Sequence, residues 1–235
     1  MIRSFFVFII LLSLILFLLA CNQVEHSNAT SLMVDLTEGK DSRPLSDEVL
    51  SLFEFEKDKW SGEFFRFSEI TDIGLMPVKK VSLGYEKSLF SNELIRNRNV
   101  DHFKREIESI VNNLESDSAG RPNSSIYLPI VKELGVLNTY KFKSRTLIIY
   151  SDLVENSPII SLYDPESYHA LETNPDSIQK LLENHASIPD LQGIRIILVY
   201  APQNLQNDER YRLVSSLYKK MLESHGAHVE ITASL

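Results

Sequence analysis

The stretch Ile194-Arg-Ile-Ile-Leu-Val-Tyr200 decides the fold class, because it is rich in β-branched residues and apolar at every position except Arg195. A strand of this composition is typical of a parallel sheet, in which strands are buried on both faces. The stretch Thr146-Leu-Ile-Ile-Tyr-Ser151 has the same character. The two stretches therefore predict interior strands of a mainly parallel sheet.

Outward from these strands, short apolar runs alternate with longer segments whose apolar residues recur every three or four positions. Further strands are predicted at residues 31–35, 64–71, 78–85, 158–163 and 228–232, and helices from about Ser46 and at residues 100–114, 126–137, 177–185 and 208–224. This alternation predicts an α/β fold, a Rossmann-like doubly wound sheet with helices on both faces. A turn between the second and third strands predicts one antiparallel edge strand.

Composition limits the class of protein further. The 235 residues are 43% hydrophobic, which is enough to bury the core of one domain. The single cysteine rules out an intramolecular disulfide. The net charge of −8 argues against a nucleic-acid partner, because nucleic-acid binding relies on cations that neutralise phosphates. We therefore expect a single α/β domain over residues 31–235 that does not bind nucleic acid.

The N-terminus carries a targeting pattern. Arg3 precedes an apolar run of 16 residues, 5–20, in which only Ser13 is polar, and Cys21 follows directly. A basic residue before such a run is typical of a signal peptide. An uncleaved anchor helix is the alternative, although the run is shorter than the roughly 20 residues that cross a bilayer. Both alternatives attach the protein to a membrane.

Leu18-Leu-Ala-Cys21 resembles the lipobox of bacterial lipoproteins, with Leu19 bulkier than the residue usual at its position. The resemblance implies cleavage before Cys21, acylation of the Cys21 thiol and a lipid anchor in the bacterial cell envelope. Asn22 rather than aspartate follows the cysteine, which implies outer-membrane sorting in enteric-type bacteria. Residues 1–20 are then the lipoprotein signal peptide, and residues 21–30 are a lipidated tether.

Two of the predicted strands end in aspartates, Asp35 and Asp152. In an open parallel sheet, ligands bind outside the carboxyl ends of the strands, at the point where the strand order reverses. Aspartates at strand ends also cap the turns that follow them, which is the ordinary structural alternative. Thr37, two residues after Asp35, adds a hydroxyl to the same predicted edge and favours a binding site.

These residues resemble the metal-ion-dependent adhesion site of von Willebrand factor A-like domains, which has a D-x-S-x-S loop after the first strand. Here that loop reads Asp35-Leu-Thr37-Glu-Gly39, and Gly39 leaves the site one hydroxyl short. The resemblance implies that Ser124 or Ser125 before a helix and Asp152 after a later strand complete the site. It also implies Mg²⁺ or Mn²⁺ as the ion and a carboxylate of a protein partner as a ligand.

Patterns typical of enzymes are missing from the sequence. The six histidines show no H-E-x-x-H spacing, and there is no G-x-S-x-G nucleophile motif, phosphate-binding P-loop or G-x-G-x-x-G motif. A haloacid-dehalogenase-like phosphatase needs an aspartate where Thr37 stands. These absences favour a binding protein over an enzyme.

The leading hypothesis is therefore an envelope lipoprotein whose von Willebrand factor A-like domain binds a protein partner without catalysis. Two alternatives stay open. One is a metal-dependent envelope phosphohydrolase in which Asp35, Thr37 and Asp152 hold a cation over a phosphate. The other is a structural lipoprotein whose metal site has decayed.

Overall fold

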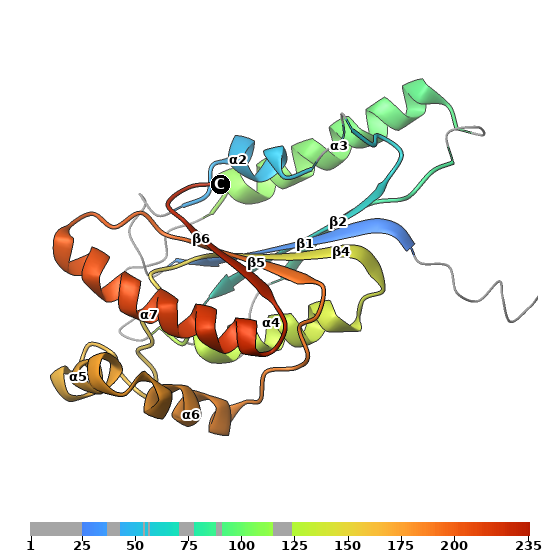
Figure 1. Ribbon diagram of the computed structural model, residues 1–235. Helices are drawn as coiled ribbons and strands as arrows, with labels where there is room; N and C mark the ends of the chain where they lie inside the picture. The colour runs from blue at the N-terminus through green and yellow to red at the C-terminus, as the bar shows by residue number, and fades with distance from the viewer. Residues whose placement is uncertain are drawn as a thin grey trace, which may run out of the picture.

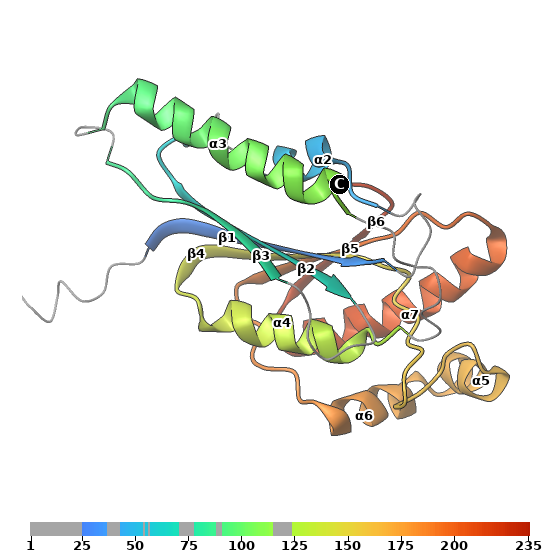
Figure 2. The same ribbon diagram turned by 180° about the vertical axis from the view of Figure 1, so that it is seen from behind.

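The computed structural model describes residues 25–36, 43–53, 55, 57–70, 78–87, 91–114 and 124–235. Within them the chain forms one twisted sheet between two layers of helices (Figures 1 and 2). The predicted signal peptide and Cys21 lie outside the described residues, as do Thr37 and Gly39. Among the described residues, no helix is both long enough and apolar enough to cross a bilayer.

The sheet has six strands in the order β3-β2-β1-β4-β5-β6. All neighbouring pairs are parallel except β2 and β3, so the antiparallel strand lies at an edge, as the sequence predicts. The strands are β1 (Glu25–Asp35), β2 (Gly62–Ile70), β3 (Val78–Leu83), β4 (Phe142–Tyr150), β5 (Ile194–Val199) and β6 (His228–Thr232). This confirms the α/β class and the Rossmann-like, mainly parallel sheet.

Helices cover both faces of the sheet, also as predicted (Figure 1). The helices on one face are α2 (Ser46–Ser51) and α3 (Glu93–Asn112), and those on the other are α4 (Tyr127–Thr139), α7 (Leu205–Ser224), α5 (Pro165–Thr173) and α6 (Pro175–His185). The helix with the clearest predicted period, α3, begins behind Asn92, whose side chain accepts the backbone N–H groups of Leu94 and Ile95. Its buried residues Val100 and Phe103 lie on the stripe that the sequence predicts.

The core is divided between the two faces because side chains alternate along a strand. In β1, Leu32 and Val34 join the cluster under α2 and α3, whereas Met33 joins the cluster under α4 and α7. Under α3, the rings of Phe53 and Phe103 meet edge to face with centroids 5.3 Å apart. Each strand of the centre therefore contributes to both cores, which explains the continuous apolar runs of β4 and β5.

Three sequence predictions are corrected. The first strand begins at Glu25 rather than at residue 31. The polar side chains at its start are typical of a tether in the sequence, but in the fold they bind neighbouring strands, as Asn28 does through its hydrogen bond to Glu63. Residues 158–163 form no strand, and only Ser161 makes an isolated bridge, to Asn156. Helix α5 was not predicted, because Leu171 is its only buried residue and one residue makes no periodic pattern.

A buried ion pair connects β1 and β2 to α4. Arg66 Nε of β2 donates to Glu133 Oε1 of α4 at 2.6 Å, and Ser31 Oγ of β1 donates to the same oxygen at 2.6 Å. Glu133 is fully buried and Arg66 is 8% exposed. A buried charge is tolerated only when it is paired, so the three side chains fix how α4 lies across the sheet.

We predict that Arg66→Met lowers the free energy of unfolding by about 3–5 kcal/mol, because it leaves the Glu133 carboxylate buried without its cation. The double variant Arg66→Met with Glu133→Leu should recover most of this loss, because it removes both charges. Urea unfolding of the three proteins measures the difference. A double variant as unstable as Arg66→Met would contradict the interpretation.

Candidate functional site

The carboxyl ends of β1 and β4 meet at the point where the strand order reverses. From β1 the chain proceeds outward to β2 and β3, and then returns to β4 on the other side of β1. Val34 of β1 lies opposite Tyr150 of β4 in the register of the two strands. Asp35 follows Val34 and Ser151 follows Tyr150, so the two residues lie side by side at the edge where open α/β sheets bind ligands.

Asp35 is the centre of this site. Its side chain is 2% exposed, and its Oδ2 atom accepts hydrogen bonds from Ser124 Oγ at 3.0 Å and from Ser151 Oγ at 3.2 Å. Ser151 Oγ in turn accepts the backbone N–H of Leu153 at 2.9 Å. The two hydroxyls compensate the burial of the carboxylate and hold it in one orientation.

Ser124 is fixed by the segment that follows β4. Its backbone N–H donates to Asn156 O at 3.0 Å, and Asn156 N–H donates back to Ser124 O at 2.9 Å. This pair of bonds attaches the residues before α4 to the loop after β4. The hydroxyl of Ser124 is therefore brought to Asp35 by a contact between segments that are far apart in the sequence.

Glu155 holds the N-terminus of α4 beside the site. Its Oε2 atom accepts the backbone N–H groups of Ile126 at 2.9 Å and Tyr127 at 2.8 Å, so the carboxylate caps the helix from another loop. Burial raises the pKa of Glu155, and hydrogen bonds from the side chains of Ser157 and Ser125 and from the two amides oppose the rise. Ser125 therefore serves the cap of α4.

Asp152 closes its own turn. Its Oδ1 atom accepts the backbone N–H of Val154 at 2.8 Å, and its Oδ2 atom lies 3.5 Å from the Tyr163 hydroxyl. The next residue, Leu153, is fully buried and has φ of 61°, a left-handed conformation that is strained for a leucine. The turn is thus held by burial of Leu153, and it places Asp152 next to Ser151 at the edge of the site.

The structure brings together part of the predicted site and adds to it. Asp35 and Ser124 are joined directly, and Asp152 lies next to Ser151 at the same edge. Ser151 and Glu155 were missed by the sequence analysis. The signal for Ser151 was its place directly before the strand-end aspartate, whereas Glu155 has no local signal because its partners lie 28 and 29 residues away.

The side-chain atoms that could bind a metal ion at this site are oxygens. Within the described ranges, no group of three or more histidine, cysteine, aspartate or glutamate side chains is arranged to hold a metal ion. The oxygens that do converge are one carboxylate and two hydroxyls, a set that suits a hard cation retaining several waters. The site can therefore hold a cation only with help from waters, from Asp152, from the loop after β1 or from a partner.

The sequence matches no protein-family model, and no curated protein matches it.

We predict that the free energy of unfolding of the wild type is larger in mild acid than at higher pH, and that this difference is smaller in the Glu155→Gln variant. The native pKa of Glu155 lies above the unfolded value, so the native state binds more protons between the two, and the free energy of unfolding falls as pH rises through this window. Denaturant unfolding at about pH 5 and about pH 8 measures the change, and glutamine should reduce it because it does not titrate there.

The control is Glu155→Ala, which removes the cap of α4 and should cost about 1 kcal/mol or more at every pH. Equal pH dependence in the wild type and the glutamine variant would show that Glu155 does not contribute.

Proposed function

We propose that this protein is a lipid-anchored lipoprotein of the bacterial cell envelope, and that its domain, similar to von Willebrand factor A-like domains, binds a protein partner without catalysis. The observation that carries the proposal is the buried Asp35 carboxylate holding the Ser124 and Ser151 hydroxyls where the strand order reverses. A sheet with only its edge strand β3 antiparallel also supports it.

The proposed site takes Mg²⁺ or Mn²⁺, which would supply an electrophilic centre for a carboxylate of the partner. Ser124 and Thr37 would bind through hydroxyls, and Asp35 and Asp152 would act mainly through bound waters. Ser151 orients Asp35 by its hydrogen bond. Because Gly39 supplies no side-chain ligand, the partner's carboxylate would fill a position that the chain leaves open.

The anchor would orient this site away from the membrane. Only residues 22–24 separate Cys21 from Glu25 at the start of β1, so an acylated Cys21 would lie within about 14 Å of the amino edge of the sheet. The 11 residues of β1 then span roughly 35 Å to Asp35 at the opposite edge. A lipid anchor at Cys21 would therefore leave the carboxyl edge accessible to a partner.

We predict that Mg²⁺ and Mn²⁺ raise the melting temperature of the full chain in detergent, because an ion that binds only the native state stabilises it. Asp35→Asn should abolish the rise, whereas Asp101→Asn, an exposed aspartate of α3, should retain it. Thermal unfolding over a titration of each ion gives the measurement.

A melting temperature of the wild type that does not change with either ion would contradict the proposed metal site. Magnesium-dependent turnover of a generic phosphoester that is lost in Asp35→Asn would favour the phosphohydrolase instead.

We predict that energy transfer from tryptophan to dansyl-labelled lipid head groups is stronger from the amino edge than from the carboxyl edge. Trp60 is the only tryptophan, and it lies close to Gly62, which pairs with Ser27 near the start of β1. The comparison protein carries Trp60→Phe with Tyr163→Trp, which moves the donor to the exposed position beside Asp152. Both proteins are measured in vesicles.

Cys21→Ser is the control and should abolish the transfer, because no lipid would then hold the protein at the bilayer. Equal or stronger transfer from position 163 would show that the domain is oriented differently.

A further inference from the structure

A cavity lies at the amino edge of the sheet, at the opposite end of β1 from Asp35. Its volume is about 720 Å³, within the range of small-molecule sites. Thr30 and Glu63 line it, and each lies two positions before a residue of the core under α2 and α3, Leu32 and Phe65, on the same face of the sheet. The cavity therefore opens on the face of the sheet that α2 and α3 cover only in part.

The floor of the cavity is a fixed chain of hydrogen bonds across three neighbouring strands. Ser144 Oγ of β4 donates to Asn28 Oδ1 of β1 at 2.7 Å, and Asn28 Nδ2 donates to Glu63 Oε1 of β2 at 2.8 Å. Ser61 Oγ donates to the same Glu63 oxygen at 2.8 Å. These bonds give each amide, hydroxyl and carboxyl group one orientation, which is what recognition of a polar ligand requires.

The rim carries two aromatic side chains, Trp60 and Tyr85. Tyr85 is 42% exposed, and Trp60 is half-buried. Aromatic rings at an accessible rim offer flat apolar surfaces beside the polar floor.

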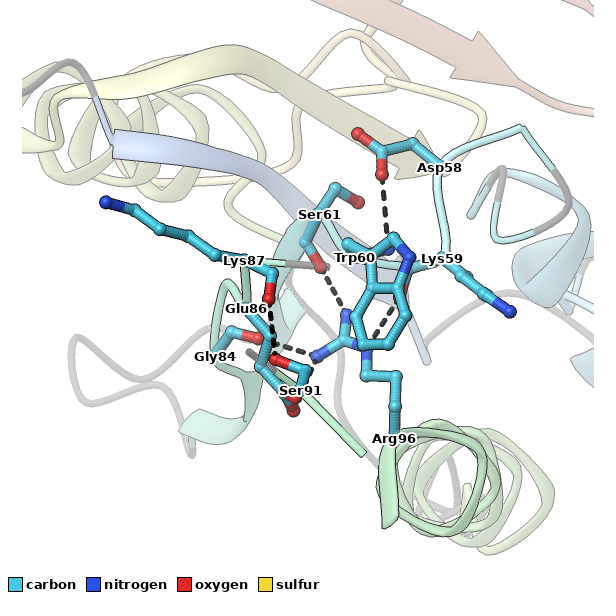
Figure 3. Close-up of polar contacts among 9 residues, drawn as sticks. All are labelled: Asp58, Lys59, Trp60, Ser61, Gly84, Glu86, Lys87, Ser91 and Arg96. Atoms are coloured by element: carbon cyan, nitrogen blue, oxygen red, sulfur yellow. Dashed lines mark hydrogen bonds and ion pairs between the residues drawn. The ribbon is translucent and has the colours of Figure 1, made fainter. Parts of the chain in front are cut away.

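A fully buried arginine, Arg96, lies between the turn that carries Trp60 and the turn that begins at Gly84 (Figure 3). Arg96 of α3 donates from Nε to Lys59 O at 2.5 Å and from Nη2 to Ser61 O at 2.5 Å, the two carbonyls on either side of Trp60. Its Nη1 atom donates to Gly84 O at 2.7 Å, directly before Tyr85. Each turn of the rim is thus attached to the same guanidinium.

A backbone hydrogen bond joins the two turns, because Glu86 N–H donates to Trp60 O at 3.1 Å. A rim that is fixed before binding loses little entropy when a ligand arrives. Burying an arginine is costly unless its donors are satisfied, and the carbonyls of these two turns satisfy the donors of Arg96.

The charges around the cavity favour a neutral ligand. Arg195 forms a two-bond ion pair with Glu230, at 2.7 Å for each bond, and Arg145 donates to Asn138 Oδ1 and to Gln192 O. Lysines and acidic residues both occur in the lining. Because the guanidinium groups are already engaged and the signs are mixed, an anion would gain little here.

We propose that this cavity binds a short neutral saccharide. A pyranose ring has apolar C–H faces that stack on aromatic rings, and a belt of hydroxyls that both donate and accept hydrogen bonds. Trp60 and Tyr85 supply the stacking surfaces, while Asn28, Glu63 and Ser144 supply the polar partners. The proposal needs neither the metal site nor the lipid anchor, because it rests on the other edge of the sheet.

Trp60 reports on the test directly, because no other tryptophan contributes to the fluorescence. The full chain is kept in a zwitterionic detergent without a sugar head group and titrated with maltotriose and with N,N′-diacetylchitobiose, up to about 50 mM, which saturates a millimolar site. We expect a saturable change in Trp60 emission with at least one of the two. Asn28→Ala should weaken it about tenfold, because it removes the centre of the floor.

Glu63→Gln keeps the shape of the floor and should weaken binding less than Asn28→Ala. Asp101→Asn, an exposed aspartate of α3 that does not line the cavity, is the control and should bind as the wild type does. No saturable change with either sugar, or unchanged binding in Asn28→Ala that is folded by circular dichroism, would overturn the proposal. Saturation by inorganic phosphate but by neither sugar would overturn it as well, since the ligand would then be an anion.

Discussion

The central strand β1 determines how the other strands and both helix layers are arranged. It pairs in parallel with β2 on one side and with β4 on the other, and its side chains enter the cores of both faces. Because no water reaches its middle, every backbone group there must find its partner in a neighbouring strand. The order of the sheet, the reversal beside β1 and the two ends where polar residues converge all follow from this position.

The two ends of β1 differ in chemistry for a physical reason. At the carboxyl end, one carboxylate, Asp35, is nearly excluded from water and is held by hydroxyls. At the amino end, Asn28 takes part in a chain of neutral and charged groups under an accessible aromatic rim. A compact, oxygen-rich site suits a hard cation, and a broad polar floor suits a ligand with many hydroxyls. We therefore propose different ligands for the two edges.

Buried polar groups position both sites from a distance. Glu155 caps α4 and so sets the place of Ser124, while Arg96 holds the turns that carry Trp60 and Tyr85. Both charged side chains are fully buried, where an unsatisfied polar group would cost free energy. Such residues limit how far a surface can change without loss of stability, because each connects segments that are distant in the sequence.

The amino-acid sequence alone predicts the α/β class, the strand-end aspartates and the antiparallel edge, because strand burial and helical period leave local patterns in the order of residues. It determined neither the start of β1 at Glu25 nor helix α5, since polar strand residues and a helix with one buried residue leave no such pattern. The contacts of Ser124 and Ser151 with Asp35, and of Arg96 with the turns of the aromatic rim, arise only when the chain is folded. These contacts join residues as far as 116 positions apart, and the pairing of distant strands, not local composition, creates them.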